Sequence, residues 1–345
     1  HPVTFFDMLT GRPAALAGAA ILAMWAGSLV PIGILQKPVL GVPLVAWAVP
    51  ISIALLLAVH LPGIGREVNG ARRWLQLGPI GFQPSEVAKW GLIATLAWWA
   101  ASRTRQLNSF RHGFLPPMLA TAAICGLIAA EDLGTAVLIF AVAIMVLLAA
   151  GCRLWHLASL VPLAAAGFVG AVLASPYRLD RLRAFLDPYN DPQGIGYHII
   201  QSMAAIGGGG LAGSGLGNSV QKFGYLPEDT TDFIFAITCE ELGLLGAVAI
   251  VSLYCGLLFL GASIALRQTD VFRRLLVIGI TSTIGLQACI NILVVTGLAP
   301  TKGIALPLLS SGGTGWLLTA FCIGLIASID RASAAAPETA PVCNA

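Results

Sequence analysis

The stretch TTDFIFAITCEELGLLGAVAIVSLYCGLLFLGASIALR, residues 230–267, decides the class of fold. It is mostly apolar from residue 233 to residue 266, which is longer than the roughly 20 residues that a helix needs to cross a membrane. Three carboxylates accompany this run, with Asp232 at its border and Glu240 and Glu241 inside it. The run indicates a membrane span, and its acidic residues are accidental, structural or chemical.

The rest of the chain has the same apolar character. Of its 345 residues, 57% are hydrophobic and 10% are charged, whereas soluble domains carry roughly 25% charged residues. Backbone groups in lipid must be paired internally, so the apolar segments are expected to be helices, and the alternation typical of a membrane barrel is absent. We predict an all-α integral membrane protein, a polytopic helix bundle with nine visible spans. Besides 233–266, these spans are 13–35, 41–62, 85–102, 115–131, 134–151, 155–175, 273–299 and 315–329.

Basic residues in the short polar segments predict the orientation of the spans. The positive-inside rule places four basic segments in the cytoplasm. The first contains Arg103, Arg105, Arg111 and His112, and the second contains Arg153 and His156. The third contains Arg267, Arg273 and Arg274, and the fourth contains Arg331. The opposite set then lies outside: 63–84, 131–134, 176–232 and 299–314. Nine spans place the N-terminus outside, and Arg66, Arg72 and Arg73 lie outside against the rule. A missing first helix would give ten spans with both ends inside.

The domain organisation that we predict is one membrane domain over residues 1–330, followed by a disordered tail over 331–345. The outer loop 176–231 is long, and long loops without regular structure are usually functional or disordered. Its glycines permit tight turns and close backbone approach, so we expect an ordered extracytoplasmic lid with short helices. The net charge of +3 is too small to indicate nucleic-acid binding, and the seven cysteines lack metal-site spacing. No metal site and no cofactor are evident.

Asp232 is the first candidate for chemistry. An ionisable residue at a membrane boundary usually faces a cavity or a partner and marks function. The alternative is a helix N-cap, because Thr and Asp typically cap an apolar run, and position alone balances the two interpretations. Glu240 and Glu241 are neighbours and point about 100° apart on a helix. For them, structural pairing with a basic residue is at least as well supported as chemistry.

A second candidate is the stretch NGARRWLQLGPIGFQPSEVAKWGLI, residues 69–93. Pro84 is typical of a helix start, with Glu86 favoured in the first turn. Lys89 follows Glu86 at i+3, on the same helix face. The pair is either an intrahelical ion pair with a snorkelling lysine or the charged wall of an outward-opening cavity.

Two further polar motifs fall on the same predicted outer face. EDLGTA contains Glu131 and Asp132, and TGLAPTKGIALPLLSSGGTGWL, residues 296–317, contains Lys302 and Ser310 within a glycine-rich segment. Glycine-rich segments can cradle phosphate, although this motif is short. The convergence of all these motifs on one face indicates a common site.

Four long motifs together resemble the SEDS family (shape, elongation, division and sporulation), which contains the RodA and FtsW peptidoglycan polymerases. They are the stretch 69–93, EDLGTA, RAFLDPYNDPQGIGYHIIQSMAAIGGGGLAGSGLGNSVQKFGYLPEDTTDFIFAITCEELGLLGA (183–247) and NILVVTGLAPTKGIALPLLSSGGTG (291–315). The match runs in order from about residue 63 to residue 330. PTKG makes the chain look more like FtsW than RodA.

The resemblance implies a ten-helix bundle that polymerises lipid II on the outer face of the bacterial cytoplasmic (inner) membrane. It also implies a class B penicillin-binding transpeptidase as partner. The essential carboxylate of the TDFIF motif is here Asp232, Glu86 and Lys89 line the same cavity, and Arg73 is the arginine before the motif's tryptophan. Three departures stand out: Thr230 where the family usually has His, Glu131 in place of proline, and LLSSGGTG in place of FISYGGSS.

The implied reaction is an inverting attack of an acceptor 4-hydroxyl on C1 of a donor sugar, with undecaprenyl pyrophosphate leaving. We expect Asp232 to be the general base, with Glu86 orienting Lys89. The expected substrate-binding residues are Glu86, Lys89, Arg73, Lys302, Ser310 and Asp132; alternatively, Lys89 pairs with Asp232.

A divalent cation (Mg²⁺ or Mn²⁺) could bridge the pyrophosphate. A lipid II flippase and a non-catalytic scaffold are the rival functions, and the clustering of motifs on one face favours the enzyme.

Overall fold

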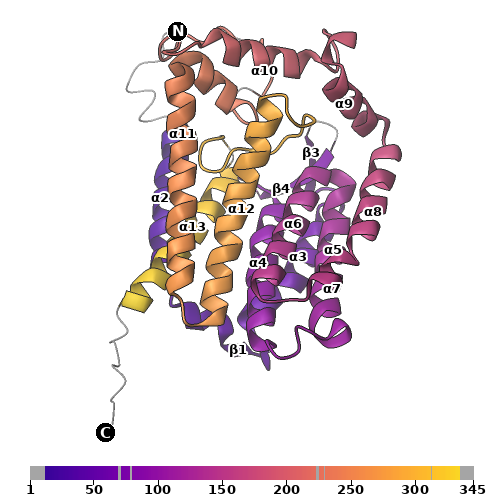
Figure 1. Ribbon diagram of the computed structural model, residues 1–345, viewed down its shortest axis with the longest axis vertical. Coiled ribbons are helices and arrows are strands. Elements are labelled where there is room, and N and C mark those ends of the chain that lie inside the picture. Colours follow the sequence, from indigo (N-terminus) through magenta and orange to yellow (C-terminus); the bar gives the residue numbers. More distant parts are fainter. Residues whose placement is uncertain are drawn as a thin grey trace.

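Long helices running side by side make up most of the chain in the computed structural model (Figure 1). The structure describes residues 12–68, 71–77, 80–222, 225–228, 230–311 and 313–334. The helices of the bundle are α2 (Arg12–Leu29), α3 (Ala48–Ala58), α4 (Pro84–Ser102), α5 (Leu115–Glu131), α6 (Leu133–Ala149), α7 (Leu154–Ala158), α8 (Val161–Leu173), α11 (Ile234–Arg267), α12 (Val271–Val295) and α13 (Gly313–Ala334).

All nine predicted spans coincide with helical segments, which confirms the predicted class of fold. Three shorter apolar helices, Ala14–Leu29, Leu44–Ala58 and Leu133–Ala149, and α4 account for four of the predicted spans. Within the described ranges, five helices are long and apolar enough to cross a membrane: Phe110–Glu131, Leu154–Leu173, Ile234–Arg267, Val271–Val295 and Gly313–Ala334.

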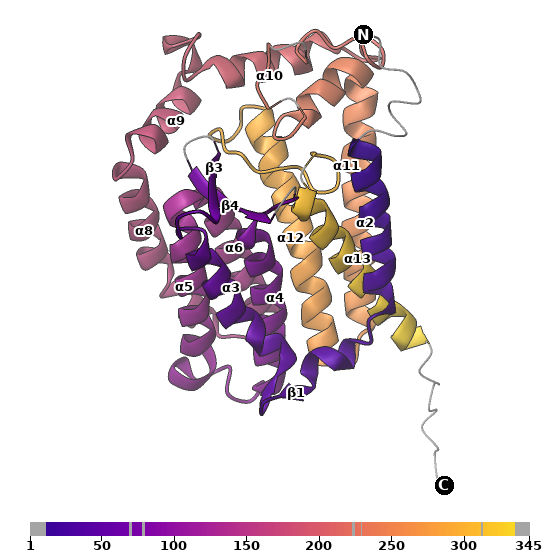
Figure 2. The ribbon, with the colours of Figure 1, turned by 180° about the vertical axis from the view of Figure 1, so that it is seen from behind.

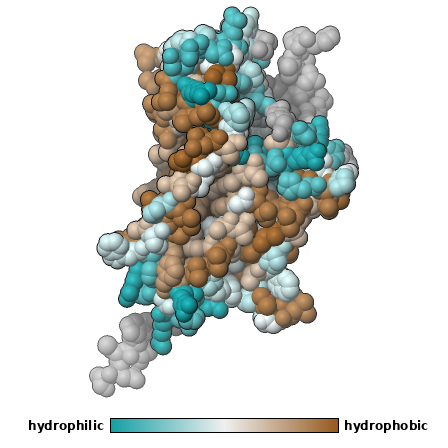
Figure 3. Space-filling model, turned by 90° about the vertical axis from the view of Figure 1, so that its right-hand side faces the viewer, coloured by the Kyte–Doolittle hydropathy of each residue, from teal (hydrophilic) through white to brown (hydrophobic). Residues whose placement is uncertain are grey.

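The two predicted sets of connecting segments separate to opposite ends of the bundle. The connections α4–α5, α6–α7 and α11–α12, predicted to be cytoplasmic, lie toward the lower end in Figure 1. The long connection between α8 and α11 lies at the other end, called the loop end below. On the face shown in Figure 3, hydrophobic residues cover the middle of the molecule and hydrophilic ones gather toward its ends. This distribution fits a bundle embedded in lipid.

The predicted lid does contain short helices. They are α9 (Pro176–Leu186), the 3₁₀ turn η4 (Pro188–Asn190) and α10 (Tyr197–Gly208), and they cover the loop end (Figure 1). The predicted tail differs in part, because α13 continues to Ala334. Residues 335–345 lie outside the described residues.

Strands occur where the sequence predicted none. A small antiparallel sheet of order β3-β4-β5 lies at the loop end, with β3 (Gly65–Val68), β4 (Ala71–Leu77) and β5 (Ile80–Phe82). A two-stranded ribbon of β1 (Pro38–Val39) and β2 (Val42–Pro43) lies at the opposite end. In β4, Arg72 and Gln76 are exposed whereas Arg73 is half-buried and Leu75 is buried. Since side chains alternate along a strand, β4 directs Arg73 toward the bundle.

Small residues bring helices close together in the bundle. A β-carbon at Gly324 of α13 would lie 2.0 Å from the carbonyl oxygen of Met24 in α2, and the two helices run side by side (Figure 2). A β-carbon at Gly279 of α12 would lie 2.4 Å from the side chain of Ile93 in α4. Such close backbone contacts are typical of helix packing in membranes.

The helix α11 is broken at Gly243, whose φ of 64° interrupts the helical backbone. The preceding loop fills the break: the N–H groups of Ser214 and Gly215 donate to the carbonyl oxygens of Glu240 and Glu241 at 2.9 and 3.0 Å. The N–H groups on the other side of the break are also paired, since Leu244 donates to the carbonyl oxygen of Gly210 and Leu245 to that of Leu211. Buried backbone groups require such partners. The segment 234–242 is therefore a separate half-helix, and Asp232 lies just before its start.

Candidate active site

Asp232 carries a carboxylate that is unpaired among the residues that the structure describes. The N-cap of α11 is Phe233, which has no side-chain cap, and the N–H of Phe233 donates to the carbonyl oxygen of Glu228 at 3.2 Å. The alternative interpretation of Asp232 as a helix cap is therefore wrong. Among the described residues, none forms a hydrogen bond or an ion pair with its carboxylate. This carboxylate lies against Gly303, where a β-carbon would be 2.7 Å from Oδ2.

The surroundings of Asp232 favour its protonated form. Burial, and then the negative charges of Glu228 and Asp132, raise the pKa of Asp232 to about 7, against the opposing effect of Arg181 and Arg73. A general base works best when its pKa lies near the working pH. The position thus suits a group that accepts a proton at neutral pH.

Asp132 and Arg73, both predicted site residues, lie together beside this carboxylate. Asp132 caps α6, accepting from the N–H of Thr135 at 3.0 Å and from its hydroxyl at 2.9 Å. The guanidinium of Arg73 is 3.5 Å from Asp132 and donates to the carbonyl oxygen of Glu131 at 2.5 Å. The Glu131 side chain, where the family usually has proline, accepts from the N–H of Arg72 at 2.9 Å. These contacts hold β4 against the turn between α5 and α6.

A small pocket of about 30 Å³ includes Arg73 in its lining. Leu56 of α3 and Leu127 and Ile128 of α5 line it on the apolar side, and Glu131 and Asp132 are among its polar lining residues. The Nε of Arg73 is buried without a partner among the described residues. Apolar side chains and the Arg73 guanidinium therefore line the same pocket.

Lys302 belongs to the same group of charges. Its side chain lies against Gly134, where a β-carbon would be 3.1 Å from Cδ, and its ammonium lies 5.8 Å from the ring centre of Phe168. Burial lowers the pKa of Lys302, Asp132 opposes this, and nearby arginines reinforce it. The structure therefore brings together Asp232, Asp132, Arg73 and Lys302.

Two site residues that sequence reasoning missed are Arg178 and Arg181 of α9. Arg178 donates to the carbonyl oxygens of Ala129, Ala130 and Ala171, so it binds α9 to the ends of α5 and α8. Arg181 donates to the carbonyl oxygen of Thr301 at 3.1 Å and acts electrostatically on Asp232. Their i,i+3 spacing places both on one helix face, a signal that was present in the sequence.

Glu86 and Lys89 form the predicted intrahelical ion pair, with the Lys89 ammonium 2.8 Å from Glu86 Oε2. The Lys89 side chain is only 1% exposed, so it does not snorkel. Its ammonium also donates to Oε1 of Gln287 at 3.0 Å. The alternative pairing of Lys89 with Asp232 is wrong, because no ion pair joins them. A direct contact of Lys89 with substrate stays a prediction.

Ser310 lies inside the protein. It is fully buried, and its hydroxyl accepts from the N–H of Leu306 at 2.6 Å, closing a turn. Its neighbour Ser311 donates to the carbonyl oxygen of Thr230 from its N–H at 2.9 Å and from its hydroxyl at 3.0 Å. The SSGG segment is therefore tied to the chain two residues before Asp232. Substrate binding by Ser310 stays a prediction.

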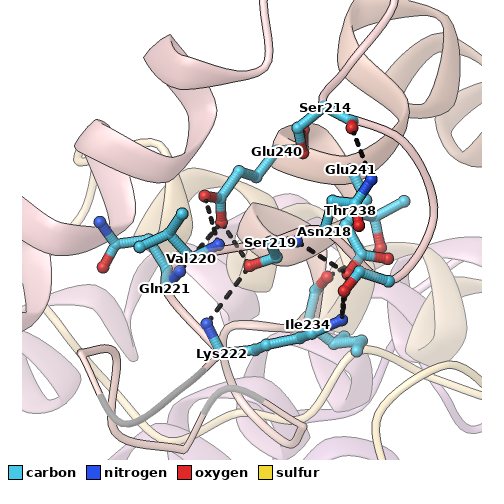
Figure 4. Close-up of polar contacts among 11 residues, drawn as sticks. Ser214, Asn218, Ser219, Val220, Gln221, Lys222, Ile234, Thr238, Glu240 and Glu241 are labelled. Carbon is cyan, nitrogen blue, oxygen red and sulfur yellow. Dashed lines mark hydrogen bonds and ion pairs between the residues drawn. The ribbon is translucent and has the colours of Figure 1, made fainter. Parts of the chain in front are cut away.

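Glu240 and Glu241 have structural contacts, as Figure 4 shows. The carboxylate of Glu240 accepts from the hydroxyl of Ser219 and from the N–H of Val220 at 2.9 Å. The Lys222 ammonium is 2.7 Å from Glu241. The prediction of pairing with a basic residue is confirmed for Glu241. Both side chains hold the loop after α10 against the half-helix.

No cluster of three or more His, Cys, Asp or Glu side chains suited to a metal ion occurs within the part of the chain that the structure describes. The predicted cation bridging a pyrophosphate therefore has no protein-made cage among these residues. It stays a prediction.

The helix bundle and its buried carboxylate, set among arginines and a lysine at one end, define a polytopic membrane protein with an enzyme-like site. Residues 3–335 match the sequence model of the FTSW_RODA_SPOVE family, described as "Cell cycle protein". The chain belongs to this family, which confirms the resemblance to RodA and FtsW.

Relatives include stage V sporulation protein E of Bacillus subtilis (strain 168), 43% identical over 284 residues that cover 82% of this chain and 78% of the relative. Another is a probable peptidoglycan glycosyltransferase FtsW of Geobacter sp. (strain M18), 42% identical over 287 residues, with coverage of 82% and 78%.

Solved structures agree with the fold. A chain from work described as "Structural coordination of polymerization and crosslinking by a peptidoglycan synthase complex" superposes with a TM-score of 0.75 at 29% identity, covering 95% of this chain and 94% of that one. The Thermus thermophilus rod shape determining protein RodA superposes with a TM-score of 0.63 at 26% identity, with coverage of 96% and 88%.

Proposed function

We propose that this protein is a peptidoglycan glycosyltransferase that polymerises lipid II into glycan strands, with Asp232 as the general base. The observation that carries the proposal is the carboxylate of Asp232, which is unpaired among the described residues, has a pKa of about 7 and is influenced by the charges of Arg73 and Arg181. The names of the relatives support the reaction class.

In the proposed step, Asp232 takes the proton of the acceptor sugar's 4-hydroxyl. The oxygen then forms a bond to C1 of the donor sugar from the face opposite the leaving group. The bond from C1 to the pyrophosphate breaks, and undecaprenyl pyrophosphate leaves with the electron pair. One displacement inverts the α-linked donor to a β-linked product.

The cations have the complementary task of stabilising charge on the departing pyrophosphate. Arg73, Arg181 and Lys302 are the groups that lie near Asp232 and Asp132. A divalent cation on the pyrophosphate would act in the same sense.

The setting follows from the same proposal. The protein resides in the bacterial cytoplasmic membrane with the loop end outside, in agreement with the basic residues at the opposite end. Its partner is a class B penicillin-binding transpeptidase, supported by the likeness to a chain of a peptidoglycan synthase complex. The gathering of site residues at one end favours the enzyme over a flippase.

The test is polymerisation of labelled lipid II by the purified protein in detergent, with its transpeptidase partner blocked by penicillin. Detergent micelles have no second compartment, so the formation of glycan strands measures the glycosyl-transfer reaction and not transport of lipid II. Glycan ladders are expected with this protein and not with the partner alone. Absence of ladders in the presence of the partner would overturn the proposal in favour of a flippase or a scaffold.

A further inference from the structure

The helix α12 carries two buried amide side chains that the mechanism above does not use. Gln287 and Asn291 are one turn apart, on the same helix face, and are 9% and 2% exposed. Amides inside an apolar helix are costly unless they are hydrogen-bonded. Their partners therefore show what the two residues do.

Asn291 joins Asp232 to the segment that follows α12. Its Nδ2 donates to the carbonyl oxygen of Asp232 at 2.8 Å and to that of Ile304 at 2.7 Å. Both partners can only accept, so the orientation of the amide is fixed. Its Oδ1 is buried without a partner among the described residues. The side chain thus keeps this orientation for its two donated bonds.

Gln287 makes the corresponding connection to Lys89. Its Nε2 donates to the carbonyl oxygen of Ala305 at 2.8 Å, and its Oε1 accepts from the Lys89 ammonium at 3.0 Å. A lysine ammonium can only donate, so this amide is also fixed in orientation. Lys89 in turn is paired with Glu86. One face of α12 therefore contacts α4, the segment 302–306 and the chain at Asp232.

The segment 302–306 runs directly beside the proposed base. The two amides hold it at Ile304 and Ala305, and between Lys302 and Ile304 stands Gly303, whose missing side chain leaves room for the Asp232 carboxylate. Because the same Asn291 amide holds both the segment and the Asp232 backbone, a shift of this amide would change the gap in which the carboxylate sits.

We propose that Gln287 and Asn291 are positioning residues for glycosyl transfer, which fix Asp232 and the Lys302–Leu306 segment relative to Lys89. The inference rests on the proposed function, because it assigns the two amides to the reaction in which Asp232 is the base. Neither amide need touch the substrate. A displacement of about 1 Å at a reacting group can cost about 100-fold in rate.

The test compares Asn291→Leu, which keeps the volume and removes the donors, with Gln287→Met, which keeps the Asn291 contacts and removes the hydrogen bonds of residue 287 with Lys89 and Ala305. The matched control is Ser202→Ala: Ser202 is fully buried and donates to the carbonyl oxygen of Val295 in α12 at 2.7 Å. Among the described residues, no hydrogen bond joins Ser202 to Asp232 or to residues 302–306. Each protein is assayed for kcat, KM for lipid II, the pH dependence of kcat, melting temperature, and hydrogen exchange of 302–306.

Asn291→Leu is expected to lower kcat by about 10- to 100-fold with KM changed less than about twofold, and to speed exchange of 302–306. The acid midpoint of kcat should fall, because a loosened Asp232 becomes better hydrated while Glu228, Arg181, Asp132 and Arg73 stay in place. Gln287→Met should lower kcat in the same way. Ser202→Ala should leave kcat, KM, the acid midpoint and the exchange of 302–306 unchanged, although it lowers the melting temperature.

A wild-type kcat and midpoint in either folded amide variant would overturn the inference, as would an equal kcat loss in Ser202→Ala. If Asn291→Leu does not fold, Gln287→Met decides alone. Asp232→Asn in the same assay separates the two proposals: if that variant polymerises, the proposed base fails. The exchange of 302–306 still reports whether the amides hold the segment.

Discussion

The carboxylate of Asp232 and the backbone of Gly303 are in direct contact, so that a β-carbon at 303 would lie 2.7 Å from Oδ2 of Asp232. Two segments about 70 residues apart thus form the two sides of one narrow gap. An oxygen this close would have to shift to accommodate even a methyl group at position 303. Gly303 is therefore part of the site for a steric reason, although it has no side chain that could take part in the reaction.

Gly303→Ala should therefore displace the Asp232 carboxylate and lower kcat for lipid II polymerisation by about 10- to 100-fold. The matched control is Gly207→Ala on α10, where a β-carbon meets no atom within 4 Å and activity should stay unchanged. Turnover by the purified variants is the measurement. Equal activity of both variants would show that the carboxylate does not need its present position.

The charges around Asp232 should set the pH dependence of the reaction. Arg181 lowers the pKa of Asp232 and Glu228 raises it. Arg181→Ala should therefore move the acid midpoint of kcat to higher pH, and Glu228→Gln should move it to lower pH. The measurement is kcat between pH 5 and 9 for each variant. Shifts in the same direction, or none, would contradict the assignment of that midpoint to Asp232.

Asp232 should also lower the stability of the protein at alkaline pH. Its pKa is raised from 3.8 to about 7 in the folded protein, so the folded state binds more protons than the unfolded state between these values. Stability then falls as pH rises through this window. Asp232→Asn, which cannot ionise, should unfold with a free energy on the order of 1–3 kcal/mol higher at pH 8, with no such gain at pH 4. Thermal melts of wild type and Asp232→Asn at pH 4 and pH 8 test this prediction. An equal stability difference between the two proteins at both pH values would refute the pKa shift.

Glu240 and Glu241 should differ in their contribution to stability. Glu240 is 8% exposed and accepts hydrogen bonds from Ser219 and Val220, so Glu240→Ala leaves buried donors without a partner, at about 1–3 kcal/mol. Glu241 pairs with Lys222 at a more accessible position, and such pairs contribute about 0–1 kcal/mol. Melting temperatures of the two alanine variants test this order. A larger loss for Glu241→Ala would contradict it.

Much of the fold could be predicted from the sequence, because membrane spans are set by local composition. Long apolar runs and the distribution of arginines separate the two ends without any knowledge of packing. The sheet around β4 was missed, since Arg72, Arg73 and Trp74 do not form a simple apolar–polar alternation. The break at Gly243 was missed as well, because it depends on backbone groups of Gly210 and Leu211 that come from another segment.

The site was predictable where a residue's chemistry is visible in its type. Asp232, Asp132, Arg73 and Lys302 are charged residues in an apolar chain, and the structure gathers them. Lys89 was chosen on the same ground and Ser310 for its glycine-rich segment, yet both point into the protein. Lys89 meets Gln287, a partner from a distant segment that the local sequence does not show, and Ser310 closes a local turn with Leu306. The role of Asn291 could not be predicted from the sequence, because it depends on the carbonyl groups of Asp232 and Ile304 that its amide contacts in the folded protein.

The most direct test of the central claim is the pH dependence of lipid II polymerisation by the wild type and Asp232→Asn. Asp180→Asn serves as the control, because the Asp180 side chain is 41% exposed and pairs only with Arg183 among the described residues. Wild type and control should gain activity as pH rises, with a midpoint near 7. Asp232→Asn should be slower by about 10²–10⁴-fold and should lack that midpoint. Glycan strands formed by Asp232→Asn at the wild-type rate, with the same midpoint, would contradict it.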